Sequence, residues 1–113
     1  MKEIKAIIRP NKLNTLRDKL MQVSGFPGMT ITKVEGCSAP TRNLSGGRVK
    51  DELVDFTPKV RVEIVAPDEA VEALVECITS VSQTGQIGDG LIWVADVERA
   101  WFLYKSVPGK PPI

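Results

Sequence analysis

Residues 84–94 read Thr-Gly-Gln-Ile-Gly-Asp-Gly-Leu-Ile-Trp-Val, a loop with three glycines that leads directly into an apolar, β-type stretch. Gly85, Gly88 and Gly90 have no Cβ, so the backbone there can adopt positive φ and approach a ligand closely. Glycine-rich loops often hold phosphate through their N–H groups. Taken alone, the glycines favour a plainer interpretation, in which Gly85 caps a helix and the rest forms a tight connector.

The elements around this loop stand in the reverse order of the usual phosphate-binding loops. A helical pattern at 67–82 precedes the loop and a strand follows it, whereas Walker and Rossmann loops lead from a strand into a helix. A phosphate here would meet the negative end of the preceding helix, so the helix macrodipole would not help to bind it. Anion affinity must therefore come from the loop's own N–H groups and from basic residues elsewhere.

Composition narrows the classes of function. The chain has 113 residues, with 15 basic and 14 acidic side chains and no histidine. Its length indicates one domain with a modest core, and its balanced charge argues against nucleic acid as a partner. The lack of histidine excludes histidine-based acid–base catalysis, Ser-His-Asp chemistry and the usual zinc sites within one chain. Apolar runs are too short for a bilayer, and residues 1–8 do not resemble a signal peptide, so we expect a cytoplasmic protein.

Hydrophobic periodicity divides the chain into strands and helices. Residues 2–9 alternate as a strand that Pro10 stops, and Asn11 is placed to cap a helix. The apolar residues of that helix recur at steps of three and four: Leu13, Leu16, Leu20 and Val23. Pro67 suits the first turn of a second helix, whose expected buried stripe is Val71, Leu74, Val75, Ile78 and Val81. The other expected strands are 29–34, 56–65 and 91–97.

The order of these elements is β-α-β, a long loop and β-α-β, which predicts a single α+β domain over residues 1–113. This is the ferredoxin-like split βαβ arrangement, a four-stranded antiparallel sheet with two helices on one face. The other face carries Ile7 and Val65 among charges, and self-association would bury it. The long loop, 36–55, has few large apolar residues, which is as typical of a flexible connection as of a partner-binding arm.

Four spaced motifs resemble the P-II nitrogen-regulatory signalling family, and the match covers nearly the whole chain. They are Ala-Ile-Ile-Arg-Pro with a following Lys-Leu at 6–13, Gly-Met-Thr at 28–30, Asp-Phe-Thr-Pro-Lys-Val-Arg-Val-Glu-Ile at 55–64 and Thr-Gly-Gln-Ile-Gly-Asp-Gly at 84–90. Members of this family are trimers of the ferredoxin-like unit, with adenine nucleotides bound in clefts between subunits. The resemblance implies that residues 36–55 are the exposed T-loop, which docks onto a membrane transporter or metabolic enzyme. Residues 83–90 would be the B-loop, which wraps the nucleotide phosphates, and residues 104–113 the C-terminal tail.

The resemblance also implies a nucleotide site, with no catalytic residue and no metal. The expected site residues are Ile7, Thr30, Gly36, Cys37, Lys59, Glu63, Val65, Thr84, Gly85, Gly88, Asp89 and Gly90. Thr30 and Glu63 correspond to positions near the base, and ordinary strand pairing explains them equally well. Lys59 corresponds to a cation that faces the ligand cleft; the alternative is a solvated sheet face or a salt bridge within a trimer. The expected ligand is ADP, AMP or ATP, and no cofactor is obligatory.

Several positions depart from the family pattern. Ala39 and Pro40 replace an Arg-Gln pair whose glutamine helps to hold the magnesium that ligates 2-oxoglutarate, so sensing of 2-oxoglutarate by that route is not expected. Glu52 stands in place of a tyrosine that is modified in some bacteria, which excludes tyrosine uridylylation there.

Three further departures remove cations from the phosphate end of the site. Leu91 replaces a lysine, and Phe102 and Tyr104 replace two arginines that reach the phosphates from the neighbouring subunit. Each charge-assisted hydrogen bond contributes about 1.5–3 kcal/mol, so the loss disfavours ATP more than AMP or a neutral adenosine moiety.

These observations predict a trimeric, non-catalytic P-II-like regulator. A small-molecule effector bound between subunits would change the order of residues 36–55, which a partner protein would then read. One alternative keeps the trimer but drops the nucleotide, leaving a constitutive interaction module for a membrane transporter or efflux component. Another is a small acylphosphatase-like enzyme on the same topology. That chemistry needs an arginine-bearing phosphate loop and a positioned asparagine, and only Arg9 near the end of the first strand is a candidate for the former.

Overall fold

A four-stranded sheet forms the centre of the molecule. The computed structural model describes residues 1–38 and 56–105. Within them the strands are β1 (Lys2–Ile8), β2 (Thr30–Gly36), β3 (Thr57–Ala66) and β4 (Leu91–Asp96). They are ordered β2-β3-β1-β4, and every neighbouring pair is antiparallel. The predicted α+β fold with a ferredoxin-like antiparallel sheet is confirmed.

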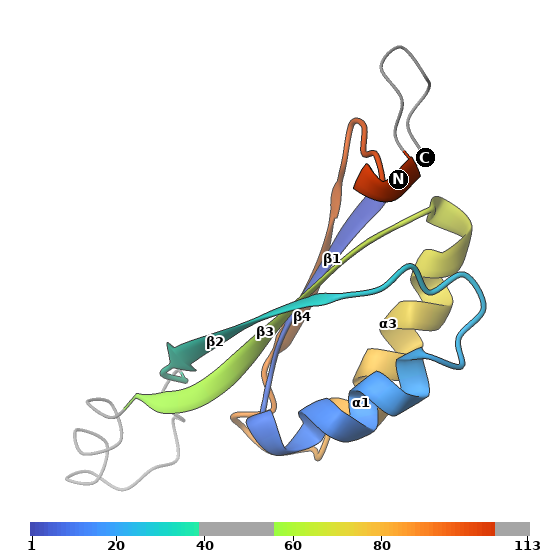
Figure 1. Cartoon of the computed structure of the whole chain (residues 1–113). Helices are drawn as coiled ribbons and strands as arrows, with labels where there is room; N and C mark the ends of the chain where they lie inside the picture. Colours follow the sequence, from blue (N-terminus) through green and yellow to red (C-terminus); the bar gives the residue numbers. More distant parts are fainter. Residues whose placement is uncertain (39–55, 106–113) are drawn as a thin grey trace, which may run out of the picture.

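Both α-helices cover the same face of this sheet (Figure 1). They are α1 (Leu13–Leu20), which follows the short 3-10 helix η1 (Pro10–Lys12), and α3 (Asp68–Ser82). A second 3-10 turn, η3 (Leu103–Lys105), follows β4. The ends of β2 and β3 that lead to residues 39–55 extend beyond the helical layer (Figure 1).

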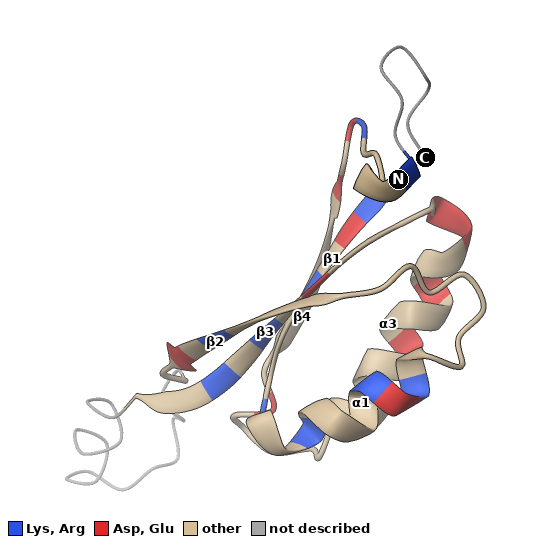
Figure 2. Cartoon of the chain, in the orientation of Figure 1, with Lys and Arg blue, Asp and Glu red and all other residues tan. Residues whose placement is uncertain are grey.

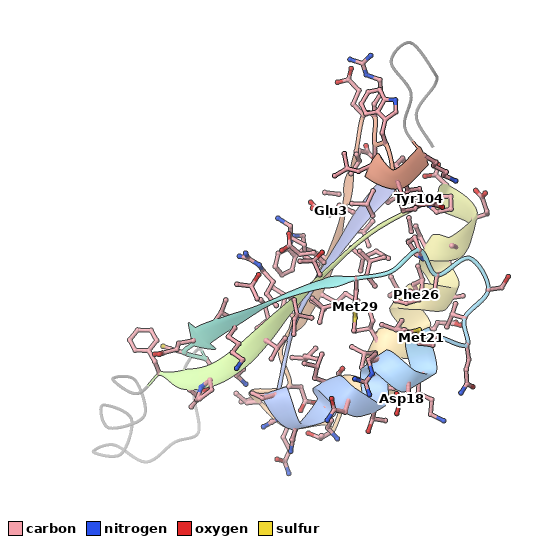
Figure 3. The ribbon with its side chains drawn as sticks, in the orientation of Figure 1. Glu3, Asp18, Met21, Phe26, Met29 and Tyr104 are labelled. Atoms are coloured by element: carbon pink, nitrogen blue, oxygen red, sulfur yellow. The ribbon has the colours of Figure 1, made fainter. Side chains whose placement is uncertain are left out.

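The core lies between the sheet and the two helices. Alternate residues of the central strands face it, so Ile4 and Ile8 of β1 and Ile64 of β3 are almost completely buried, as is Leu74 of α3. Phe26 and Met29, in and beside the segment that joins α1 to β2, pack against this core (Figure 3). This period of two in the strands and of about four in α3 is the pattern that the sequence predicts.

The other face of the sheet is uncovered in the single chain. Ile7 lies opposite Leu91, and Lys5 opposite Trp93, so these residues share that face. Leu91 is 66% and Trp93 39% exposed. β1 and β3 also carry charged residues, and the acidic residues of α3, which are Asp68, Glu69, Glu72 and Glu76, are all exposed (Figure 2).

The starts of both helices differ from the sequence expectation. Asn11 does not cap α1, because Pro10–Lys12 forms a 3-10 turn first and Lys12 occupies the N-cap position without a side-chain hydrogen bond. Pro67 is likewise the N-cap of α3 and precedes its first turn. The strand bounds move by one or two residues, as expected where ends fray.

The buried stripe of α3 is also rotated from the expectation. Val75 and Val81 are only partly buried, whereas Ala70 and Ser82 are buried with Val71 and Leu74. The helix therefore presents small residues to the sheet at both ends of its buried face. Most of the T-loop (39–55) and most of the C-terminal tail (106–113) lie outside the described residues, as do Ala39, Pro40 and Glu52.

Candidate functional site

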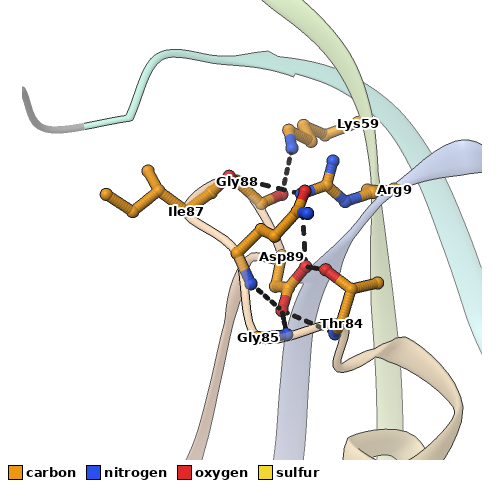
Figure 4. Close-up of polar contacts among 8 residues, drawn as sticks. Arg9, Lys59, Thr84, Gly85, Ile87, Gly88 and Asp89 are labelled. Carbon is orange, nitrogen blue, oxygen red and sulfur yellow. Dashed lines mark hydrogen bonds and ion pairs between the residues drawn. The ribbon is translucent and has the colours of Figure 1, made fainter.

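The carboxylate of Asp89 organises the B-loop. One of its oxygens, Oδ2, accepts hydrogen bonds from the backbone N–H groups of Thr84 at 2.7 Å, Gly85 at 2.9 Å and Gln86 at 3.3 Å (Figure 4). The other, Oδ1, accepts from the hydroxyl of Thr84. The backbone N–H of Asp89 in turn donates to the carbonyl of Gln86 at 3.2 Å. Three of the loop's N–H groups are thus already bound to an anion that the loop itself provides.

Two cations reach this loop from the neighbouring strands. Arg9 follows the end of β1, and its Nη2 lies 3.2 Å from Oδ1 of Asp89 and 3.3 Å from the carbonyl oxygen of Ile87. Lys59 of β3 donates from Nζ to the carbonyl of Gly88 (Figure 4). Both contacts join residues about 30 to 80 positions apart in the sequence. The strands therefore hold two positive charges against one turn of the B-loop.

The pKa values of Asp89 and Lys59 both lie below their usual values, which favours the charged form of Asp89 and disfavours the charged form of Lys59. The pKa of Asp89 lies well below its usual range, chiefly because the Thr84 hydroxyl and backbone N–H donate to the carboxylate, with Gly85 and Arg9 adding to the effect. Burial lowers the pKa of Lys59, and the nearby Arg9 guanidinium lowers it further, while Asp89 opposes the change. Lys59 is only 9% exposed as a whole residue, and its ammonium is partly buried where it donates to Gly88.

The three glycines of the B-loop share a positive φ but differ in the space that a Cβ would find. Gly85, Gly88 and Gly90 all have positive φ, of 86°, 102° and 113°. A Cβ on Gly90 would lie 1.7 Å from the carbonyl oxygen of Ile7, so this part of the loop presses directly on β1. A Cβ on Gly88 would lie 3.2 Å from Arg9 Nη2, and one on Gly85 would meet nothing within 4 Å.

A second group of expected site residues lies elsewhere on the same sheet face. Thr30 and Glu63 are direct cross-strand partners, and both line a pocket of about 510 Å³ together with Val65 and Phe102. The carboxylate of Glu63 lies 3.5 Å from Arg61 Nε and 4.0 Å from Lys5 Nζ. Thr30 and Glu63 are thus paired across the two strands and also line a pocket, so both interpretations of these residues stay open.

The remaining expected residues lie close to one of these groups or at the edge of the described chain. Gly36 ends β2, and a Cβ there would lie 3.4 Å from the side chain of Lys59. Ile7 lies between Arg61 and Leu91 in the sheet register. Cys37 is exposed, one residue beyond β2.

Arg9 and Phe102 are not among the nucleotide-site residues predicted from the sequence, where Arg9 is a candidate only for an acylphosphatase-like loop and Phe102 only replaces a family arginine. Arg9 contacts the B-loop directly, and Phe102 lines the pocket beside Thr30 and Glu63. The alternation of residues 2–9 places Arg9 on the same face as Ile7, and that signal is available from the sequence. Its contact with Asp89, 80 positions away, is not.

The part of the chain that the structure describes contains neither a metal-binding cluster nor a membrane-spanning helix. In residues 1–38 and 56–105, no three or more cysteine and carboxylate side chains are grouped so as to hold a metal ion. Nor does any helix in those ranges have the length and apolar character to cross a bilayer.

Comparison with known proteins gives one consistent result. Residues 1–106 match the family model described as Nitrogen regulatory protein P-II. The chain is 48% identical over 99 residues to the nitrogen regulatory protein P-II of Pasteurella multocida and 46% identical over 100 residues to that of Haemophilus influenzae. It is 46% identical over 99 residues to nitrogen regulatory protein P-II 1 of Escherichia coli K12. Each match covers 88% of both chains.

Proposed function

Because this chain belongs to the P-II family of nitrogen regulatory proteins, we propose that it senses an adenine nucleotide or related small ligand at the B-loop and signals through residues 36–55. The family assigns it the role of a non-catalytic signal-transduction regulator. The acylphosphatase-like alternative is thereby set aside.

The convergence of Arg9 and Lys59 on the B-loop carries this proposal. Two cations face one carboxylate, so the site keeps an excess of positive charge that favours an anionic ligand. Partial burial of the Lys59 ammonium strengthens its attraction to a nearby anion, because charges interact more strongly where less water surrounds them. The side chain of Lys59 lies beside Gly36, at the base of the T-loop, and also donates to the B-loop. A ligand that displaces Lys59 would therefore affect the segment that binds the partner protein.

The ligand we propose is an adenine nucleotide of low charge. Asp89 already accepts from three N–H groups of the B-loop, so fewer donors remain for a polyphosphate. Leu91, Phe102 and Tyr104 supply no positive charge. On these grounds AMP and ADP are favoured over ATP, with the base beside Thr30 and Glu63.

A homotrimer in the cytoplasm is the assembly we propose. The uncovered sheet face presents Leu91 and Trp93 to solvent in the single chain, and burying such a face is a common reason for self-association. A cleft between subunits would then be bounded by this face. Sedimentation equilibrium of the purified chain tests the assembly directly.

Isothermal titration tests the ligand. AMP, ADP and ATP are titrated separately, with and without 2-oxoglutarate or bicarbonate. We expect Lys59→Gln to weaken binding by about tenfold or more, since a hydrogen bond to a charged group contributes about 1.5–3 kcal/mol. Lys33→Gln, which removes an exposed lysine of β2, is the matched control and leaves affinity nearly unchanged. If no nucleotide binds at millimolar concentration, the ligand proposal fails.

A second candidate function is a constitutive interaction module for a membrane transporter or efflux component. The observation in its favour is again Asp89, because a loop that satisfies its own N–H groups is ordered without a ligand. A pull-down with equal capture in the presence and absence of nucleotide supports this candidate. A deletion of residues 40–50 that still captures the partner contradicts it.

A further inference from the structure

A small pocket lies behind the B-loop, on the helix side of the sheet. Its volume is about 210 Å³. Its walls come from the last turn of α3, from β1 and β4, and from the end of the B-loop, with Ile8, Ile78, Ile92 and Gly90 among the lining residues. Lys59 and Glu63 of the proposed nucleotide site lie on the opposite face of the sheet, because they alternate with the buried residues of β3. The pocket is thus a separate site that shares with the proposed nucleotide site only Ile7 of β1 and the B-loop residues Asp89 and Gly90.

One polar group in this pocket has no partner. Ser82 is 7% exposed, and its hydroxyl oxygen is buried without a hydrogen bond among the described residues. It follows Leu74 and Ile78 at steps of four, so α3 directs it toward the sheet. A serine hydroxyl can donate one hydrogen bond and accept two. Buried hydroxyls in folded proteins nearly always have a partner, so this one indicates a ligand or a bound water.

The rest of the lining restricts what the ligand can be. Most of it is apolar, with Ala6, Ile8, Ile78 and Ile92 among its residues, and Thr79 and Gln83 add uncharged polar groups at the end of α3. Asp89 is the one charged residue among the described residues of the lining, and its carboxylate is engaged by the B-loop. Such a pocket has no cation to offer an anion. In size it exceeds a cavity of about 150 Å³ that is known to bind benzene.

We propose that this pocket binds a small uncharged amphiphile of about the size of phenol, whose hydroxyl forms a hydrogen bond with Ser82. The apolar body of the ligand lies against the isoleucines, and its polar end lies at the last turn of α3. Asp89 and Gly90 form part of the wall, so an occupied pocket alters the B-loop from behind. This inference goes beyond the proposed function, because it requires neither nucleotide nor partner.

Phenol is the probe, and NMR of the full-length chain in its native assembly is the measurement. Methyl resonances of Ile8, Ile78 and Ile92 are followed as phenol is added, and benzene is titrated in parallel. The matched variants are Ser82→Ala and Ser80→Ala. Ser80 is exposed on the same helix and donates to the carbonyl of Cys77, so it reports any general effect of removing a hydroxyl.

We expect saturable shifts with phenol in the wild type and in Ser80→Ala. In Ser82→Ala, phenol should bind about fivefold more weakly, while benzene binds at least as well as before, because the pocket remains and only the hydroxyl is lost. The proposal is overturned if phenol gives no saturable shift in the wild type. It is equally overturned if phenol binds Ser82→Ala and wild type alike. Nucleotide titrations bear on neither outcome, so failure here is separate from failure of the proposed function.

Discussion

Replacing Gly90 by alanine tests how tightly the B-loop is joined to the sheet. The new Cβ would lie 1.7 Å from the carbonyl oxygen of Ile7 and 2.8 Å from its carbonyl carbon. Both are backbone atoms of β1, one of the two central strands, so they cannot move aside as a flexible side chain can. The loop must therefore shift away from β1. Gly90 also has φ of 113°, a conformation that alanine rarely adopts.

The loss of stability in Gly90→Ala has two contributions, backbone strain and steric overlap, and a substitution at Gly85 separates them. A non-glycine residue with positive φ costs about 1–2 kcal/mol, and overpacking typically adds about 1–3 kcal/mol. Gly90→Ala should therefore lower the free energy of unfolding by about 2–5 kcal/mol. Gly85→Ala shares the positive φ, of 86°, but its Cβ meets nothing within 4 Å. That variant should lose only the first contribution.

Urea denaturation of wild type, Gly85→Ala and Gly90→Ala at one protomer concentration measures both losses. The concentration is fixed because self-association makes apparent stability depend on it. A Gly90→Ala variant no less stable than Gly85→Ala would show that the loop does not press on β1, and the geometry argued above would be wrong.

Three further predictions follow from other residues. Asp89→Asn should destabilise the protein most at about pH 6 and progressively less as pH falls below about 4, because the folded-state pKa of Asp89 lies well below its unfolded value. Its contribution is complete above the unfolded pKa and is lost as pH falls through the folded one, so only part of the effect should be gone at about pH 3; paired urea titrations along this pH series check the trend. Leu74→Ala should cost about 2–5 kcal/mol in urea denaturation, because Leu74 is fully buried, whereas Leu103→Ala at a 93% exposed position should change little. Iodoacetamide at about pH 8 should label exposed Cys37 before Cys77, because burial raises the pKa of the Cys77 thiol; mass spectrometry of timed samples checks the order.

The sheet and both helices could be predicted because each has a regular hydrophobic period. Alternation in residues 2–9 and in 56–65 assigns the buried face of β1 and β3 correctly, and strand order follows from the topology of the split βαβ unit. The start of α1 could not be predicted in the same way. Asn11 is a good N-cap by type, but Pro10 begins a 3-10 turn that moves the helix start past it.

The buried end of α3 shows a different limit. A search for apolar residues at helical spacing finds Val75 and Val81, yet the helix turns Ser82 toward the sheet and leaves Val75 and Val81 half-buried. Spacing alone places position 82 on the face of Leu74 and Ile78. Residue type argued against it, because serine is mostly exposed in proteins. Packing against the sheet sets the orientation of α3, and these tertiary contacts cannot be read from the spacing of residues within the helix.

The B-loop shows how tertiary contacts change the meaning of a motif. The glycines provide the conformations that the sequence predicts, but their N–H groups turn toward Asp89, a residue inside the same motif. A helix C-terminus behind the loop is unfavourable for a phosphate, and a loop whose donors already bind a carboxylate has less to offer one. An incoming anion must therefore rely on Arg9 and Lys59, and must compete with Asp89 for the first of them. The glycines let the loop lie close to β1, and anion binding at the proposed site would depend on Arg9 and Lys59.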